Sequence, residues 1–245
     1  MTDRFSPQAG LYAKYRPHYP SELFDFILSP VYYRHSAWDC ATGNGQTAKE
    51  LAKYFTEVKA TDISQKQLDN AYRAFNVDYS LQPAEQTDFG NNSFDLITVS
   101  QALHWFDFDK FYAEVYRVAK PDAWLAIWFY SLLRISSTID PIIYHYHFNT
   151  IGKYYDEGRK YVDTNYETIP FSFPETKTAN FSGICYWTLE ELEGYFNTSS
   201  ALHKYIAANG ESPVPAIMDQ IRTYWTDTKM KIVFPLQVKM GQVRK

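Results

Sequence analysis

The sequence predicts an α/β protein with a doubly wound, mostly parallel sheet of seven strands and a helical cap inserted in the C-terminal half. Between residues 37 and 130, short β-rich apolar segments alternate with amphipathic segments of helical period. The segment at 94–99 is almost continuously apolar, which is typical of a parallel strand buried on both faces. This alternation favours a parallel sheet with right-handed crossovers and helices on both faces.

Seven segments have the composition of strands. They cover residues 37–41, 58–62, 77–81, 94–99, 123–130, 178–186 and 231–238. The two late segments are expected to extend the sheet at one edge. Pro235 lies in the last of them and cannot donate to a sheet ladder, so it suits an edge strand or a bulge.

Helices are expected between these strands. Residues 46–55 place apolar side chains on one face, and Ser64 is a suitable N-cap for a helix that runs to residue 75. A third helix covers 108–118 and is ended by the Lys-Pro pair that follows.

The second half has a different texture, rich in tyrosine and histidine. Residues 141–160 look helical, and Thr188 with Glu191 three positions later has the spacing of a capping box, which begins further helices up to residue 225. We therefore expect one domain over 1–245. Its parts are a cofactor-binding core at 12–130, a helical cap and substrate region with one late strand at about 131–228, and final edge strands at 229–245.

Composition excludes several classes of protein. The 245 residues contain 24 Lys and Arg against 28 Asp and Glu, with no basic run, which argues against a nucleic-acid partner. No apolar stretch approaches the roughly 18 residues of a membrane span. Cys40 and Cys185 lie far apart, and His145 and His147 point to different sides of a helix, so no metal is expected. We expect a cytoplasmic monomer or homodimer.

One G-x-G pair, Gly43 and Gly45, lies between the first strand and the first helix. Glycines there let the backbone approach a ligand, with helix N–H groups pointing at it. Asp62 ends the second strand about twenty residues on, where an acid binds ribose hydroxyls. These features fit a dinucleotide or another nucleoside cofactor. Asp39 distinguishes between these two kinds of cofactor, because its negative charge would repel the pyrophosphate of a dinucleotide and attract an ammonium group.

Two further clusters follow predicted strands. Ala84 and Glu85 come just after the third strand, where a loop can meet an adenine. The fourth strand leads into QALHWF at 101–106, a polar and then aromatic run at the strand end where open α/β sheets bind ligands.

These residues together resemble the class I S-adenosylmethionine-dependent methyltransferases, and in particular the type 11, trans-aconitate methyltransferase-like subgroup. The resemblance rests on DCATGNG at 39–45, DIS at 62–64, AE at 84–85, NSFDLI at 92–97, YAKYRPHYP at 12–20 and QALHWF at 101–106. It is dense over residues 12–130 and looser beyond. It implies a Rossmann-like methyltransferase fold, S-adenosylmethionine as cofactor and S-adenosylhomocysteine as product.

The resemblance also implies roles for residues around the cofactor. Those expected to bind it are Tyr12 and Arg16 over the methionine carboxylate, Gly43 and Gly45 around the methionine, Asp39 beneath it, Asp62 on the ribose, Ile63, Ala84 and Glu85 at the adenine, and Gln101 and Trp105 after the fourth strand. Pro83 and the Lys-Pro-Asp-Ala sequence at 120–123 depart from the subgroup's pattern, which puts adenine recognition and the turn geometry in question.

Methyl transfer from a sulfonium is an in-line displacement that depends mostly on positioning. Tyr12 and Trp105 are candidates for a cation–π contact with the sulfonium. His104 is the candidate general base for an acceptor that carries a proton, whereas a carboxylate acceptor needs none. Arg134 is the candidate cation for an anionic acceptor.

The sequence thus favours a methyltransferase acting on a small molecule, with a carboxylate as the candidate acceptor group. Two alternatives stay open: a nicotinamide-dependent oxidoreductase, and a non-catalytic S-adenosylmethionine-binding module that grips a protein partner. At the level of residues, Asp62 can instead be a helix cap, His104 a packing residue, and Tyr12, Tyr15 and Tyr19 packing aromatics.

Overall fold

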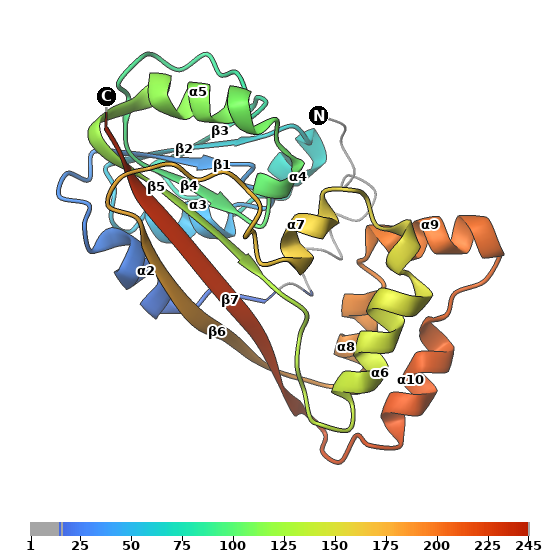
Figure 1. The fold of residues 1–245 in the computed structure, drawn as a ribbon. Coiled ribbons are helices and arrows are strands. Elements are labelled where there is room, and N and C mark those ends of the chain that lie inside the picture. Colours follow the sequence, from blue (N-terminus) through green and yellow to red (C-terminus); the bar gives the residue numbers. More distant parts are fainter. Residues whose placement is uncertain (1–14, 16, 245) are drawn as a thin grey trace.

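A computed structural model of the chain describes residue 15 and residues 17–244. Seven strands form one sheet in the order β3-β2-β1-β4-β5-β7-β6. They are β1 (Ser36–Cys40), β2 (Glu57–Asp62), β3 (Val77–Leu81), β4 (Phe94–Ser100), β5 (Ala119–Tyr130), β6 (Lys177–Trp187) and β7 (Met230–Val243). The first five pair in parallel and the last two antiparallel, so the predicted mostly parallel seven-stranded sheet is confirmed (Figure 1).

The two late strands extend one edge of the sheet, as expected, but the last strand is not at the edge. β7 lies between β5 and β6, so the prediction of an edge position for Pro235 is wrong. The carbonyl of Pro235 accepts a hydrogen bond from Ser131 N, at 2.9 Å, just past the end of β5. In an antiparallel strand, N–H and C=O of one residue point the same way. The missing N–H therefore costs the sheet a bond only where the β5–β7 ladder ends.

The sheet is buried on both faces, and successive residues of β5 show the alternation. Trp124, Ala126 and Trp128 belong to one hydrophobic core, whereas Leu125 and Ile127 belong to the core on the opposite face. The strand is thus a continuous run of buried side chains, which explains its unbroken apolar sequence.

Helices cover both faces. The helices around the sheet are α2 (Ser21–Leu28), α3 (Gln46–Leu51), α4 (Gln65–Asp69), the short 3₁₀ turn η2 (Leu103–Trp105) and α5 (Phe108–Val118). α2 and α3 contribute to the core that contains Trp128, and α5 contributes to the other. The helix at 108–118 and the Ser64 N-cap are as expected, while α2 had no predicted counterpart.

Two predicted helices are shorter in the structure. α3 ends at Leu51 rather than at residue 55, and in the turn that follows the side-chain amide of Asn76 donates to the carbonyls of Ala52 and Phe55, at 2.9 Å each. α4 ends at Asp69 rather than at residue 75.

β5 begins immediately after α5, four residues earlier than expected. The register shifts between Phe94 and Leu96, and Asp122 takes a left-handed φ of 63°. Lys120 Nζ binds both carboxylate oxygens of Asp95 at 2.9 Å, which ties this irregular start to β4. The Lys-Pro-Asp-Ala sequence therefore forms a bulged strand start in which an aspartate supplies the left-handed residue.

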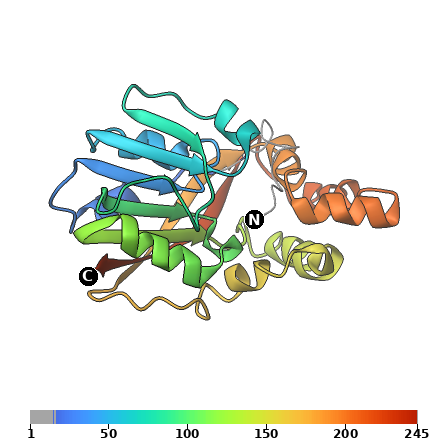
Figure 2. The same ribbon diagram turned by 90° about the horizontal axis from the view of Figure 1, so that it is seen from above.

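A helical cap lies beyond the carboxyl ends of the parallel strands (Figures 1 and 2). It consists of α6 (Asp140–Tyr144), the π-helical η3 (His145–Thr150), the 3₁₀ turn η4 (Gly152–Tyr154), α7 (Arg159–Asp163), α8 (Leu189–Phe196), α9 (Ser200–Asn209) and α10 (Val214–Arg222). The single helix expected at 141–160 is thus a series of short helical pieces. The capping box of Thr188 and Glu191 at α8 is confirmed. Across the described residues, every helix is too short or too polar to cross a bilayer.

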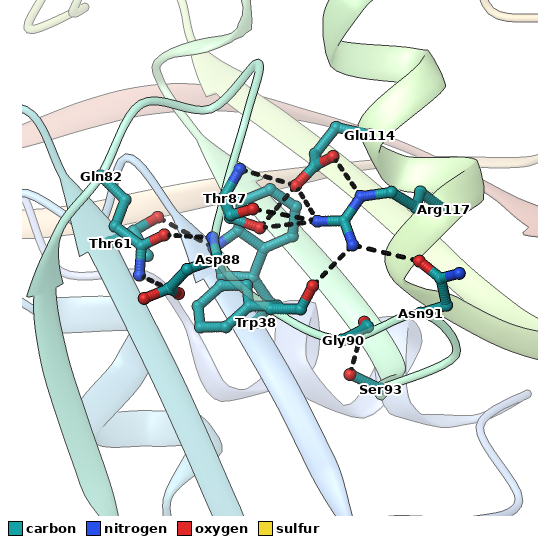
Figure 3. A network of polar contacts seen from close by, with 11 residues as sticks. Trp38, Thr61, Gln82, Thr87, Asp88, Gly90, Asn91, Ser93, Glu114 and Arg117 are labelled. Atoms are coloured by element: carbon teal, nitrogen blue, oxygen red, sulfur yellow. Dashed lines mark hydrogen bonds and ion pairs between the residues drawn. The ribbon is translucent and has the colours of Figure 1, made fainter.

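The loop between β3 and β4, residues 82–93, is held against α5 by a polar network (Figure 3). Glu114 is buried and accepts hydrogen bonds from Thr87 N at 2.7 Å and from the Thr87 hydroxyl. Arg117 binds the same carboxylate and donates to the carbonyls of Thr87 and Phe89. Since this loop carries Ala84 and Glu85, the network fixes the segment expected to meet an adenine.

Replacing Glu114 by Gln should lower the free energy of unfolding by about 1–3 kcal/mol, because one partner of a buried charged network is lost. Burial raises the pKa of Glu114, but bonds from Arg117 and Thr87 outweigh it and hold the pKa below 4.5. The stability lost in E114Q is therefore present above that pH and disappears as the pH falls further. Urea unfolding of wild type and E114Q across this pH range measures it. The exposed Glu211→Gln is the control, and an equal loss in both variants would contradict the account.

Candidate functional site

The segment after β1 is a turn built from left-handed residues. Ala41, Gly43 and Gly45 have φ of 54°, 56° and 78°, and Gly45 is the N-cap residue of α3. Gly43 N–H donates to Asp62 Oδ2 at 2.9 Å, which joins the turn to the end of β2. A Cβ on Gly43 would meet open space, whereas one on Gly45 would overlap the hydroxyl of Tyr79. The two glycines are thus required for different reasons, one of them purely conformational.

Asp39 lies fully buried under this turn. Its carboxylate accepts hydrogen bonds from the hydroxyls of Thr42 at 2.5 Å and Thr98 at 2.9 Å. Burial raises the pKa of Asp39 to about 7, although both hydroxyls act to lower it. Asp39 is not part of the lining of the cavity beside the turn, and its side chain supports the turn through the hydrogen bond from Thr42.

A small cavity, the turn cavity, opens beside the glycine turn. Its lining is Pro17, Tyr19, Ala41, Thr42, Gly43, Asn44, Gln46, Ser100, Gln101 and Tyr130. Asn44 Nδ2 is buried there without a hydrogen-bond partner among the described residues. Of the residues that the sequence predicts to bind the cofactor and that the structure describes, Gly43 and Gln101 line this cavity. Tyr12 and Arg16 lie outside the described residues.

The remaining predicted cofactor residues lie at neighbouring strand ends. Asp62 Oδ1 accepts from Ser64 N at 2.9 Å, so its carboxylate also organises the start of α4, next to the partly exposed Ile63. Ala84 is buried in the core, and Glu85 Oε1 accepts from Asp107 N at 3.2 Å. These residues stand at the same end of the sheet but are not part of the lining of the turn cavity.

Gln101 forms the wall between the turn cavity and a second cavity. Its backbone is left-handed, with φ of 55°, and its N–H donates to Trp128 O at 2.8 Å. Its side-chain Oε1 accepts from Tyr130 N at 2.8 Å and its Nε2 donates to Tyr130 O at 3.3 Å. The amide thus pairs with β5 in place of the strand that ended at Ser100, and Gln101 and Tyr130 line both cavities.

The second cavity, the cap cavity, lies between the sheet end and the cap and measures about 110 Å³. That is several times the space a single water needs. Its lining is Gln101, His104, Trp105, Tyr130, Ser131, Leu132, Ile143, Tyr146, His147, Ile151, Tyr155, Arg159, Tyr195, Phe196, Thr198, Ser199 and Ser200. These lining residues include one arginine, which is ion-paired with Asp163 at 2.9 Å, and no carboxylate, so the cavity itself presents a cationic hydrogen-bond donor and no anionic side chain.

Arg159 is the cation of the cap cavity, and sequence reasoning missed it. It follows Gly158, where a Cβ would overlap the carbonyl oxygen of His104, so only glycine brings α7 this close. Arg159 Nε donates to Asp163 at 2.9 Å and its Nη2 to His147 Nε2 at 3.1 Å. Arg134, the cation expected from the sequence, lines a neighbouring cavity instead. Short helices left no periodic signal that would have placed Arg159.

His147 is buried and sits between Arg159 and Tyr155. Because a guanidinium only donates, His147 Nε2 accepts from it, and Nδ1 carries the proton toward the Tyr155 hydroxyl, 2.9 Å away. Burial lowers the pKa of His147, which agrees with a neutral ring. In the described part of the chain, no group of His, Cys, Asp and Glu side chains has the arrangement of a metal site.

His104 and Trp105 line the cap cavity next to the Gln101 wall. Burial, and then the charge of Arg159, lowers the pKa of His104 to about 3. His104 Nδ1 is hydrogen-bonded to the Tyr166 hydroxyl at 2.6 Å. The ring is therefore neutral and already paired on one side, which makes it a weak proton acceptor. Trp105 packs on it, with ring centroids 4.5 Å apart.

Comparison with known proteins places this architecture among methyltransferases. Residues 38–127 match a family described as a methyltransferase domain. A Dictyostelium discoideum protein named as a methyltransferase is 34% identical over 249 residues, covering 98% of this chain and 95% of the relative. The structure of a type II methyltransferase from Anaeromyxobacter dehalogenans is 31% identical, with a TM-score of 0.85, covering 94% of this chain and 98% of that one.

A more distant structure shares the fold alone. It is a phosphoethanolamine N-methyltransferase from Haemonchus contortus, solved with phosphomonomethylethanolamine and S-adenosylhomocysteine. The identity is 14% and the TM-score 0.55, with 100% of this chain and 61% of that one covered.

Alanine at the two turn glycines should separate backbone strain from steric overlap. G43A and G45A both force a left-handed alanine, which costs about 1–2 kcal/mol of stability. G45A should cost clearly more, because its methyl group overlaps Tyr79, whose hydroxyl is held by Tyr72 O at 2.5 Å. Urea unfolding measures both. Gly210→Ala, also left-handed and in open space, sets the backbone cost alone. Equal losses in G43A and G45A would refute the overlap.

Proposed function

Since the chain belongs to the class I S-adenosylmethionine-dependent methyltransferases, we propose that it methylates a small-molecule acid held in the cap cavity. The family excludes the nicotinamide-dependent alternative. The observation that carries the proposal is the pair of cavities that share Gln101 and Tyr130, one at the glycine turn and one under the cap. A methyl donor in the first and an acceptor in the second would meet at this wall.

The residues of the turn cavity fit the methionine end of the cofactor. Gly43 offers a backbone without a Cβ beside open space, and Asn44 has a buried amide donor free to meet a carboxylate. The Asp62 carboxylate, at the end of the neighbouring strand, is the proposed ribose ligand, and its two backbone bonds hold it in place. Ile63, Ala84 and Glu85 are proposed to border the adenine.

The cap cavity supports an anionic acceptor with an apolar body. Arg159 supplies the positive charge, and its Nη1 has no bonding partner among the described residues. The apolar part of the lining includes Ile143, Ile151 and Phe196. The Haemonchus enzyme shares the fold, and its structure is a complex with phosphomonomethylethanolamine and S-adenosylhomocysteine, which supports a small-molecule acceptor for this chain. We also propose that the chain belongs to the trans-aconitate methyltransferase-like subgroup.

The chemistry needed at this site is positioning. Bound S-adenosylmethionine supplies an electrophilic methyl group. Arg159 would orient the acid so that one carboxylate oxygen reaches the place where the two cavities adjoin, at the roughly 3 Å that in-line attack on the methyl carbon requires. That oxygen would form the new bond as the methyl–sulfur bond breaks, and no proton would move, so a carboxylate acceptor requires no base. Trp105, which lines the cap cavity, is the proposed aromatic side chain that would exclude water and contact the sulfonium.

Arg159→Met should raise KM for an acid acceptor roughly 10- to 100-fold, because a charge-assisted hydrogen bond is lost. The Kd for S-adenosylmethionine should stay unchanged. The assay is transfer of tritiated methyl to trans-aconitate, fumarate and phenylacetate, with cofactor affinity from calorimetry. Arg134→Met is the matched control, since Arg134 lines the neighbouring cavity, which Arg159 also borders, and is not part of the cap cavity lining. Equal KM values for R159M and wild type, or no cofactor binding by the wild type, would defeat the proposal. Cofactor binding without transfer to any acceptor would instead favour the non-catalytic alternative.

His104→Gln should leave the shape of the pH profile of kcat/KM unchanged between about pH 5 and 9. With its pKa lowered to about 3, His104 is neutral throughout that range and titrates below it. The profile is measured with the acid from the panel that reacts fastest. An inflection near pH 6–7 that H104Q removes would show instead that His104 acts as a base.

A further inference from the structure

The hydroxyl of Tyr146 stands out in the wall of the cap cavity. Tyr146 belongs to the π-helical η3 and is 4% exposed. Its hydroxyl oxygen is buried and has no hydrogen-bond partner among the described residues. The Tyr146 side chain is part of the lining of the cap cavity, so an occupant of that cavity is a candidate partner for the hydroxyl.

Neighbouring tyrosines differ from Tyr146 in this respect. The Tyr155 hydroxyl is bonded to His147, and the Tyr166 hydroxyl is bonded to His104. These two hydroxyls serve the protein's own polar groups. A buried hydroxyl left without a partner is costly, and native proteins satisfy nearly all such groups. Since the Tyr146 side chain borders a cavity, a molecule bound in that cavity is a candidate for the missing partner.

The position of the Tyr146 hydroxyl is fixed by packing. Its ring lies against Phe196 of α8, with centroids 5.2 Å apart, and both rings belong to the core that joins the cap to the sheet. Burial raises the pKa of Tyr146, so the group stays a neutral O–H across the physiological range. It can therefore donate one hydrogen bond at a defined place and does not repel an anion.

We propose that Tyr146 is an acceptor-binding residue that donates a hydrogen bond to an oxygen atom of the methyl acceptor. This inference rests on the proposed function, and it narrows the substrate class. Arg159 takes an anionic group, and Tyr146 takes a second oxygen that accepts a hydrogen bond, from a carbonyl, a hydroxyl or another carboxylate. The acceptor is then an acid with at least two oxygen-bearing groups on a small apolar frame, rather than a simple monocarboxylic acid.

Tyr146→Phe removes only the hydroxyl and separates the possible roles of this residue. Y146F should be as stable as the wild type or more stable in thermal unfolding, because an unsatisfied buried hydroxyl is replaced by hydrogen. The Kd for S-adenosylmethionine should not change. KM for trans-aconitate or fumarate should rise roughly tenfold, and phenylacetate, which lacks the second oxygen-bearing group, should be methylated equally well or equally poorly by both proteins.

Tyr144→Phe is the matched control, because Tyr144 is two residues away, 58% exposed and outside the cap cavity. It should leave KM and stability unchanged. The inference is overturned if KM for the dicarboxylic and tricarboxylic acids is the same in Y146F and wild type, or if Y146F is clearly less stable, which would reveal a structural partner. Absence of transfer by the wild type to every acid would defeat the proposed function first, and this inference with it.

Discussion

The pairing of the Gln101 side chain with the backbone of Tyr130 is the contact on which the layout of the site depends. β4 ends at Ser100, and the next residue turns into a left-handed conformation that costs about 1–3 kcal/mol for a residue other than glycine. Two amide hydrogen bonds to β5 offset that cost. These bonds hold Gln101 beside the end of β5. Gln101 and Tyr130 therefore form the wall that the two cavities share.

The two sides of that wall are built in different ways. On the cofactor side, backbone geometry dominates: a turn of left-handed residues, a buried aspartate beneath it and a second aspartate at the next strand end. On the acceptor side, side chains from short cap helices dominate, among them Tyr146, Tyr155 and Arg159. A shared cofactor needs one invariant cradle, whereas acceptor choice can change with the cap while the sheet stays the same.

This difference explains why the cofactor side of the site could be predicted from the sequence and the acceptor side could not. The strands, the glycine turn and the capping box at Thr188 follow from local patterns of polarity and turn chemistry, and the structure has them where they were expected. The order of β6 and β7 depends on pairing between distant segments, so Pro235 was misplaced. Arg159 and Tyr146 sit on helical pieces of five or six residues, too short for periodicity to show which way a side chain points. Arg134 was predicted as the cation because it follows the fifth strand in the sequence. Position along the chain does not show which cavity a side chain lines, and Arg134 lines the neighbouring one.

A crystal structure of the protein with S-adenosylhomocysteine would test the central claim most directly. The account predicts the methionine end in the turn cavity, the ribose hydroxyls on Asp62, and the sulfur beside Gln101 and Tyr130, facing the cap cavity. A ligand bound with its sulfur directed away from that wall, or seated outside the turn cavity altogether, would contradict it.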